Sequence, residues 1–74
     1  MNAESILLVH STTHAVYFEK QLSQAGLMCQ LVPVPRQLSS DCGVCVRFLN
    51  ADRHRVQEIV KNSGIEIQAI IDLV

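Results

Sequence analysis

Cys42 is the residue of this sequence whose type and position could best support chemistry. It follows a stiff, polar segment that begins with Pro33 and Pro35 and carries Arg36, and Gly43 comes directly after it. Because such a segment costs ordering entropy and contributes little to a core, it is either an ordinary hairpin loop or a means of presenting the cysteine. A presented thiolate is a nucleophile and can hold a group for transfer.

Cys42 and Cys45 have the spacing of a redox or zinc-binding pair. Redox pairs of this kind stand at a helix N-terminus, whereas the alternation that starts at Val44 predicts a strand. Side chains three positions apart on a strand lie on opposite faces, roughly 10 Å apart, and a disulfide needs Cα atoms within about 7 Å. We therefore predict no functional dithiol. Cys45 should face the open side of the sheet beside Arg47, and Cys29 should be a small buried apolar side chain.

Metal and acid–base chemistry are not favoured by the other side chains. His10 and His14 could join Cys42 around a metal, but no carboxylate cluster accompanies them, so we predict no metal site. Paired carboxylates for acid–base catalysis are also missing from this region. We expect no cofactor, and a carrier or binding protein rather than an enzyme.

Two strand–helix–strand units are expected to position these residues. A wholly apolar run predicts a buried first strand, and apolar residues spaced three and four apart predict each helix. Gly26 and Gly64 are expected to end the helices in the left-handed conformation. In chain order we predict a strand at Ile6–Val9, a helix through Ala15, Phe18, Leu22 and Ala25, a strand at Leu27–Val32, a strand through Val44, Val46 and Phe48, a helix through Val56, Ile59 and Val60 capped by Asn50–Asp52, and a strand through Ile65, Ile67, Ala69 and Ile71.

The order β-α-β-β-α-β predicts an α+β, ferredoxin-like sandwich in which two helices cover one face of a four-stranded antiparallel sheet. A weak internal repeat supports this, since Gly26–Gln30 resembles Gly64–Gln68. The first and third strands should be central. With 74 residues, the chain should form a single domain, 1–74.

This topology brings the chemical residues to one end of the domain, where the first strand ends, the first helix starts and the third strand begins. The N-terminus of a helix carries free N–H groups and partial positive charge. Together with Arg36 it would favour thiolate over thiol at an accessible, reactive Cys42, or at least form an anion-binding corner. The candidate binding residues around Cys42 are Arg36, Gly43, Ser11, Thr12 and His10.

Composition narrows the choice of partners. Apolar residues make up 49% of the sequence and the net charge is -1, so a basic nucleic-acid or anionic-lipid surface is not expected. No apolar run reaches the roughly 20 residues that span a bilayer. The first residues lack the features of a signal peptide, and unexported cysteines stay reduced. We therefore expect a cytoplasmic protein that binds neither nucleic acid nor membrane.

The sheet face away from the helices is expected to expose apolar side chains. By strand parity these are Met28, Val32, Ile70 and either Ile6 and Leu8 or Leu7 and Val9. An uncovered apolar patch usually finds a partner. We therefore expect a homodimer formed through this open face.

The motifs resemble those of a small bacterial family of domains of unknown function, described as selenium/sulfur carrier-like. The resemblance runs from about Ile6 to Ile71. It rests on Ser11-Thr12 before the helix, on Leu31–Arg36, and above all on the way this Pro-x-Pro-Arg segment is followed by Cys42-Gly43.

The resemblance implies a protein that holds sulfur or selenium on a cysteine, as a persulfide or a selenium adduct, and passes it from a donor protein to an acceptor protein. Cys42 stands in the motif position, with Gly43 behind it and Arg36 in the loop. The alternative is a non-catalytic module in regulation or assembly. Such a module would bind a small anion or a partner protein and would use Cys42 only for packing.

Overall fold

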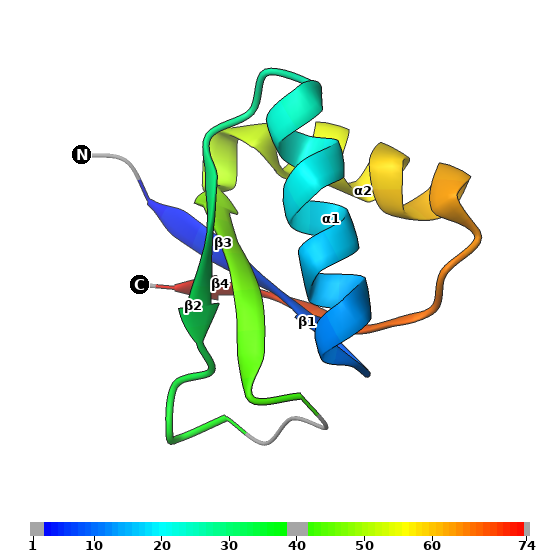
Figure 1. Cartoon of the computed structure of the whole chain (residues 1–74). Helices are drawn as coiled ribbons and strands as arrows, with labels where there is room; N and C mark the ends of the chain where they lie inside the picture. Colours follow the sequence, from blue (N-terminus) through cyan, green and yellow to red (C-terminus); the bar gives the residue numbers. More distant parts are fainter. Residues whose placement is uncertain (1–2, 39–41, 74) are drawn as a thin grey trace.

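The computed structural model describes residues 3–38 and 42–73. It confirms the order β-α-β-β-α-β (Figure 1). The second and last strands begin two residues later than the predicted starts at Leu27 and Ile65. The elements are β1 (Glu4–Val9), α1 (Thr12–Gln24), β2 (Cys29–Pro33), β3 (Val44–Leu49), the short 3-10 helix η1 (Asn50–Asp52), α2 (Arg53–Ser63) and β4 (Ile67–Leu73).

The strands form one antiparallel sheet in the order β2-β3-β1-β4, so β1 and β3 are central as predicted. Leu7 of β1 pairs with Val46 on one side and with Ile70 on the other. Side chains of both helices pack into the core cluster on one face of the sheet, and none packs into the cluster on the other face. This is the ferredoxin-like α+β arrangement.

Both helices end where the sequence predicted. Ser11 caps α1, because its hydroxyl accepts the N–H of His14 at 3.3 Å and its carbonyl accepts that of Ala15 at 3.2 Å. Gly26 and Gly64 follow α1 and α2 with φ of 83° and 73°, a region that side-chain-bearing residues adopt only with strain.

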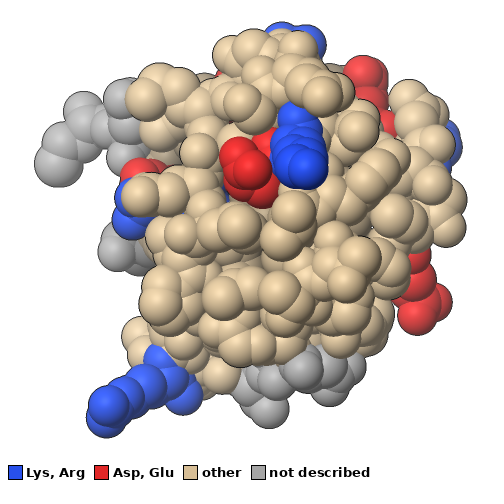
Figure 2. All heavy atoms as spheres, viewed as in Figure 1, with Lys and Arg blue, Asp and Glu red and all other residues tan. Residues whose placement is uncertain are grey.

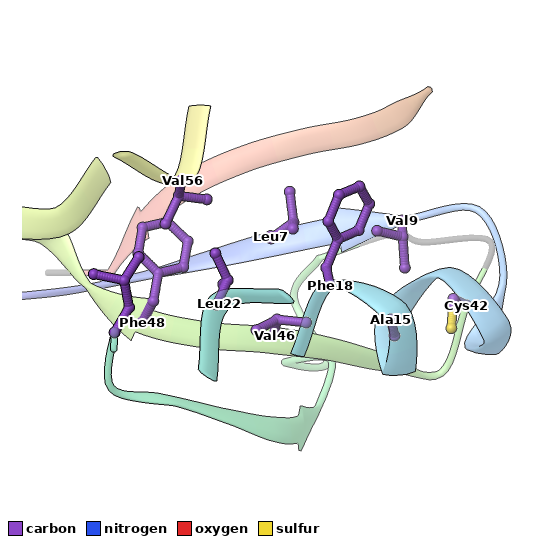
Figure 3. Close-up of a cluster of buried hydrophobic side chains, with 10 residues drawn as sticks. Leu7, Val9, Ala15, Phe18, Leu22, Cys42, Val46, Phe48 and Val56 are labelled. Carbon is purple, nitrogen blue, oxygen red and sulfur yellow. The ribbon is translucent and has the colours of Figure 1, made fainter. Parts of the chain in front are cut away.

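The core lies between the sheet and the helices. Phe18 and Leu22 of α1 and Val56 of α2 are fully buried against the central strands (Figure 3). Burying one such side chain is worth roughly 1.5–3 kcal/mol. The sheet contributes Leu7, Val9, Val46 and Phe48 to the same cluster.

An irregularity in β4 overturns the prediction that its alternate residues share one face. Leu8 pairs with Ala69 but Val9 pairs with Ile67, so Gln68 is an extra residue in the ladder. A shift of one residue reverses the faces of all side chains beyond it. Ile70 therefore packs on the helix side, and the prediction that it faces away from the helices was wrong.

The expected uncovered patch on the outer face of the sheet is also corrected. Ile6 and Leu8 do face this side, but they are 0% and 2% exposed. Met28 precedes β2 and is 72% exposed. Ile6 and Leu8 are buried because side chains from both sheet edges and from the loop after β2 cover the centre of the outer face. These half-buried residues are Val32, Val34, Leu38, Ala69, Ile71 and Leu73.

A small polar cluster ties the strands to the start of α2. The hydroxyl of Ser5, a buried residue, donates to Asp72 at 2.8 Å and accepts from the amide of Asn50 at 3.0 Å. Arg53 forms an ion pair with the same Asp72 carboxylate. The buried hydroxyl is therefore satisfied, as buried polar groups must be.

The described helices include none that is long and apolar enough to cross a membrane. On the face that carries α1 and β2, acidic and basic side chains are few (Figure 2). This face therefore has no extended basic patch of the kind that binds nucleic acid.

Candidate functional site

The end of β1, the start of α1 and the start of β3 meet at one end of the domain, as predicted. Antiparallel pairing of β1 with β3 sets the end of β1 beside the start of β3. Cys42 stands two residues before β3, and its Sγ lies 3.5 Å from the Oγ1 of Thr12, the first residue of α1. The structure thus brings Cys42 and Thr12 into direct contact across thirty residues of sequence.

Cys42 is nevertheless buried. Its side chain is 5% exposed and belongs to the helix-side core cluster, beside Ala15 at the first turns of α1 (Figure 3). The prediction of an accessible cysteine was therefore wrong. The physical reason is that a cysteine behaves as a small apolar side chain, and this one packs into the core beneath the first turns of α1.

The start of α1 gives the sulfur a positively polarised neighbour. The first N–H groups of a helix have no acceptor within it, and their dipoles place partial positive charge at this end. The first turn of α1 carries no acidic residue that would offset this charge. Thr12 and the start of α1 therefore surround the Cys42 sulfur with polar, positively polarised groups.

Ser11 and Gly43 lie next to these groups. Ser11 holds the first turn of α1 through its cap. Gly43 is exposed, and its carbonyl accepts the N–H of Val34 at 3.1 Å. A Cβ added to Gly43 would meet nothing within 4 Å and the residue has no positive φ, so the fold itself does not require glycine there. What glycine provides is open space beside Cys42.

Arg36 and His10 are exposed. Arg36 occupies a turn that the N–H of Leu38 closes on the carbonyl of Pro35 at 3.0 Å. His10 Nε2 lies 3.8 Å from Glu66 Oε1, a distance that suits an ion pair when the imidazole is protonated. Sequence reasoning missed Glu66, because the predicted topology sets the end of β1 beside the start of β4 but does not show which way the side chain of a residue before the strand points.

Cys45 lies on the other face of the sheet from Cys42, which confirms that prediction. It is fully buried with Ile6 and Leu8. Burial and the neighbouring Cys42 raise the pKa of its thiol, and Arg47 lowers it in part. The net rise keeps Cys45 protonated at neutral pH.

Cys29 is only half-buried, less than predicted. Its thiol donates to the carbonyl of Glu19 at 3.3 Å. Burial, and then the Glu19 carboxylate, raise the pKa of this thiol too. Two of the three cysteines are thus poor nucleophiles at neutral pH, and all three are free thiols.

The raised pKa of Cys45 predicts a loss of stability in alkaline solution. Its thiol ionises above the ordinary pKa of 9.0 when folded and near that value when unfolded, so the unfolded chain loses its proton first. The contribution to stability is therefore complete below pH 9.0 and falls as the pH rises from there toward the folded pKa. Between about pH 8 and about pH 10, the free energy of unfolding measured in urea should fall less for Cys45→Ala than for the wild type. An equal fall in the two proteins would contradict the raised pKa of Cys45.

No group of three or more potential metal ligands occurs among residues 3–38 and 42–73. A hollow of about 360 Å³ does open at the end of the sheet opposite Cys42. Within it Arg47 is held by Gln30 at 2.6 Å and by Glu4 at 3.5 Å. The lining residues are Glu4, Ser23, Leu27, Met28, Cys29, Gln30, Arg47, Phe48 and Leu49.

The fold and the site together define a small ferredoxin-like domain with a cysteine packed against the start of its first helix. A family model described as "Putative Se/S carrier protein-like" matches residues 4–72, and the chain belongs to this family. This confirms the resemblance that the motifs predicted. A relative from Escherichia coli (strain K12), described as "Uncharacterized protein YtiA", is 28% identical over 57 residues, which are 77% of this chain and 67% of that protein. No solved structure matches the chain.

Proposed function

We propose that this chain is a carrier that holds sulfane sulfur or selenium on Cys42. The observation that carries the proposal is the contact of Cys42 with Thr12 at the start of α1, where a helix terminus carries partial positive charge. Membership of the selenium/sulfur carrier-like family supports it. So do the raised pKa values of Cys29 and Cys45, which leave Cys42 as the candidate thiol.

The loading step is an exchange at a sulfur atom. The Cys42 thiolate attacks the terminal sulfur of a persulfide on a donor protein, and a new S–S bond forms while the donor's S–S bond breaks. The donor thiol leaves with the electron pair of the broken bond and takes up the proton that Cys42 released. Oxidation states balance, so neither a cofactor nor an external oxidant is needed. The same exchange, run onto an acceptor protein, unloads the carrier.

The other candidate residues have distinct roles in this proposal. The N–H groups at the start of α1 and the Thr12 hydroxyl stabilise the charged sulfur, with Ser11 holding the helix turn in place. Arg36 adds positive charge from the exposed loop before Cys42, and His10 adds less, because its charge when protonated is shared with Glu66. Gly43 leaves room for the reactive group of the partner.

The burial of Cys42 adds a requirement. A sulfur that is 5% exposed cannot be reached by a cysteine of another protein, so loading needs a local opening at this end of the domain. The donor protein is expected to dock here and favour the open form.

The test is intact mass after incubation with a cysteine desulfurase and cysteine. The wild type should gain the mass of one sulfur atom, reversibly with dithiothreitol, and Cys42→Ala should gain none. The matched controls Cys29→Ala and Cys45→Ala should load like the wild type, and circular dichroism should show all three variants folded. No gain in the wild type, or an equal gain in Cys42→Ala, would make Cys42 a packing residue. Selenocysteine in place of cysteine, from which the same enzyme forms a cysteine-bound selenium adduct at the persulfide level, distinguishes a selenium carrier from a sulfur carrier.

Two further variants test the surroundings of Cys42 in the same assay. Arg36→Gln and Gly43→Ala should keep the wild-type free energy of unfolding, since both positions are exposed. Each should slow loading about tenfold, the equivalent of about 1.4 kcal/mol in the transition state. Wild-type loading rates would remove these residues from the site.

A further inference from the structure

The outer edge of β4 is an unprotected sheet edge. β4 has one neighbour in the sheet, β1, and it is the longest strand, with seven residues. It contains no proline, lysine or arginine, the residues that usually keep an edge from pairing with another chain. Its aliphatic side chains are only half-buried, whereas those of β1 are at most 2% exposed.

The other edge of the same sheet is protected. β2 has five residues and ends at Pro33, and Pro35 follows two residues later. Proline cannot donate to a ladder and is a common block to edge pairing. The contrast within one sheet marks β4 as the edge on which a further strand fits.

A second copy of β4 fits this edge by its own sequence. The irregularity at Gln68 leaves Ala69–Leu73 as regular strand. In an antiparallel pair centred on Ile71, the middle of this segment, each Ile71 stands opposite its counterpart and each Ala69 opposite Leu73 of the second copy. Paired residues share a face, and Ala69, Ile71 and Leu73 do all lie on the outer face of the sheet while Ile70 lies on the helix side.

Charge also permits this pairing. Asp72 is the single ionised side chain of β4, and its carboxylate is already bound by Arg53 and Ser5 of its own chain. In the same register it stands opposite the uncharged Ile70. Two copies therefore meet without like charges facing each other across the ladder, which would be destabilising.

We infer that two copies of this chain pair through their β4 edges into one continuous antiparallel sheet of eight strands, twice the four of one chain. The two-fold axis stands perpendicular to the sheet, so the helices of both copies cover the same face. This interface differs from a dimer through the outer face, whose centre is already closed within one chain.

Sedimentation equilibrium over a wide range of concentration tests the inference. The wild type should dimerise, and Ala69→Lys should raise the dissociation constant at least about tenfold, because lysine on an edge strand opposes pairing. Val32→Lys is the matched control on the same face at the other edge, and it should leave the dissociation constant within about twofold. Circular dichroism checks that both variants fold.

Hydrogen exchange on the wild type gives a readout that needs no variant. Amide protection within Ala69–Leu73 should rise with protein concentration, while protection in β2 should not. A wild type that stays monomeric, or protection that does not depend on concentration, would overturn the inference. So would a dimer that Val32→Lys breaks and Ala69→Lys leaves intact, since this would place the interface elsewhere.

Discussion

Phe18→Ala is expected to leave much of the chain unfolded at room temperature. Phe18 is fully buried at the centre of the helix-side core. Truncating a buried phenylalanine to alanine costs about 3–5 kcal/mol, because contacts are lost and a cavity remains. A domain this small lies near the low end of the 5–15 kcal/mol typical of folded proteins, so about the whole margin is removed. Urea unfolding followed by circular dichroism measures the loss.

Val16→Ala is the matched control on the same helix. Val16 is 37% exposed, so its truncation should cost less than about 1 kcal/mol. If Phe18→Ala unfolded at nearly the same urea concentration as Val16→Ala, the packing of α1 on the sheet described here would be wrong.

Native Cys42 is expected to react with a bulky aromatic disulfide about 100-fold more slowly than the same residue in the urea-unfolded chain. At 5% exposure its sulfur is out of reach of such a reagent until the structure opens locally. An opening that costs about 2.7 kcal/mol accounts for a reduction of this size. Timed quenching followed by peptide mapping assigns the rate to each cysteine separately.

Cys29 and Cys45 serve as references in the same reaction. Cys29 is half-buried and Cys45 is fully buried, and both have raised pKa values. Reaction of native Cys42 as fast as in the unfolded chain would show that the site is open in solution. The carrier would then need no help from a donor protein to expose its thiol.

Local patterns were enough to predict the elements and their order. Ala15, Phe18 and Leu22 follow the helical period, and Gly26 and Gly64 mark both helix ends. Because right-handed connections allow only a few arrangements of these elements, their order also predicted which strands are central. The same topology correctly placed Cys42 and Thr12 at one end of the domain.

What the sequence could not show depends on contacts between distant residues. The extra residue at Gln68 is visible only when β4 is paired with β1. The burial of Cys42 depends on how closely α1 approaches the start of β3. Val34 and Leu38 did carry a weak signal, because two apolar residues in an otherwise polar loop suggest that the loop packs against something.

The placement of Cys42 and Cys45 on opposite faces of the sheet bears on how long a loaded carrier would last. A persulfide beside a second thiol is short-lived, since that thiol attacks the inner sulfur, closes a disulfide and releases hydrogen sulfide. Here the two sulfurs lie on opposite faces of the sheet, so Cys45 cannot attack a persulfide on Cys42 of the same folded chain. A sulfur atom on Cys42 would leave by encounter with another molecule, so the protein could store it between donor and acceptor.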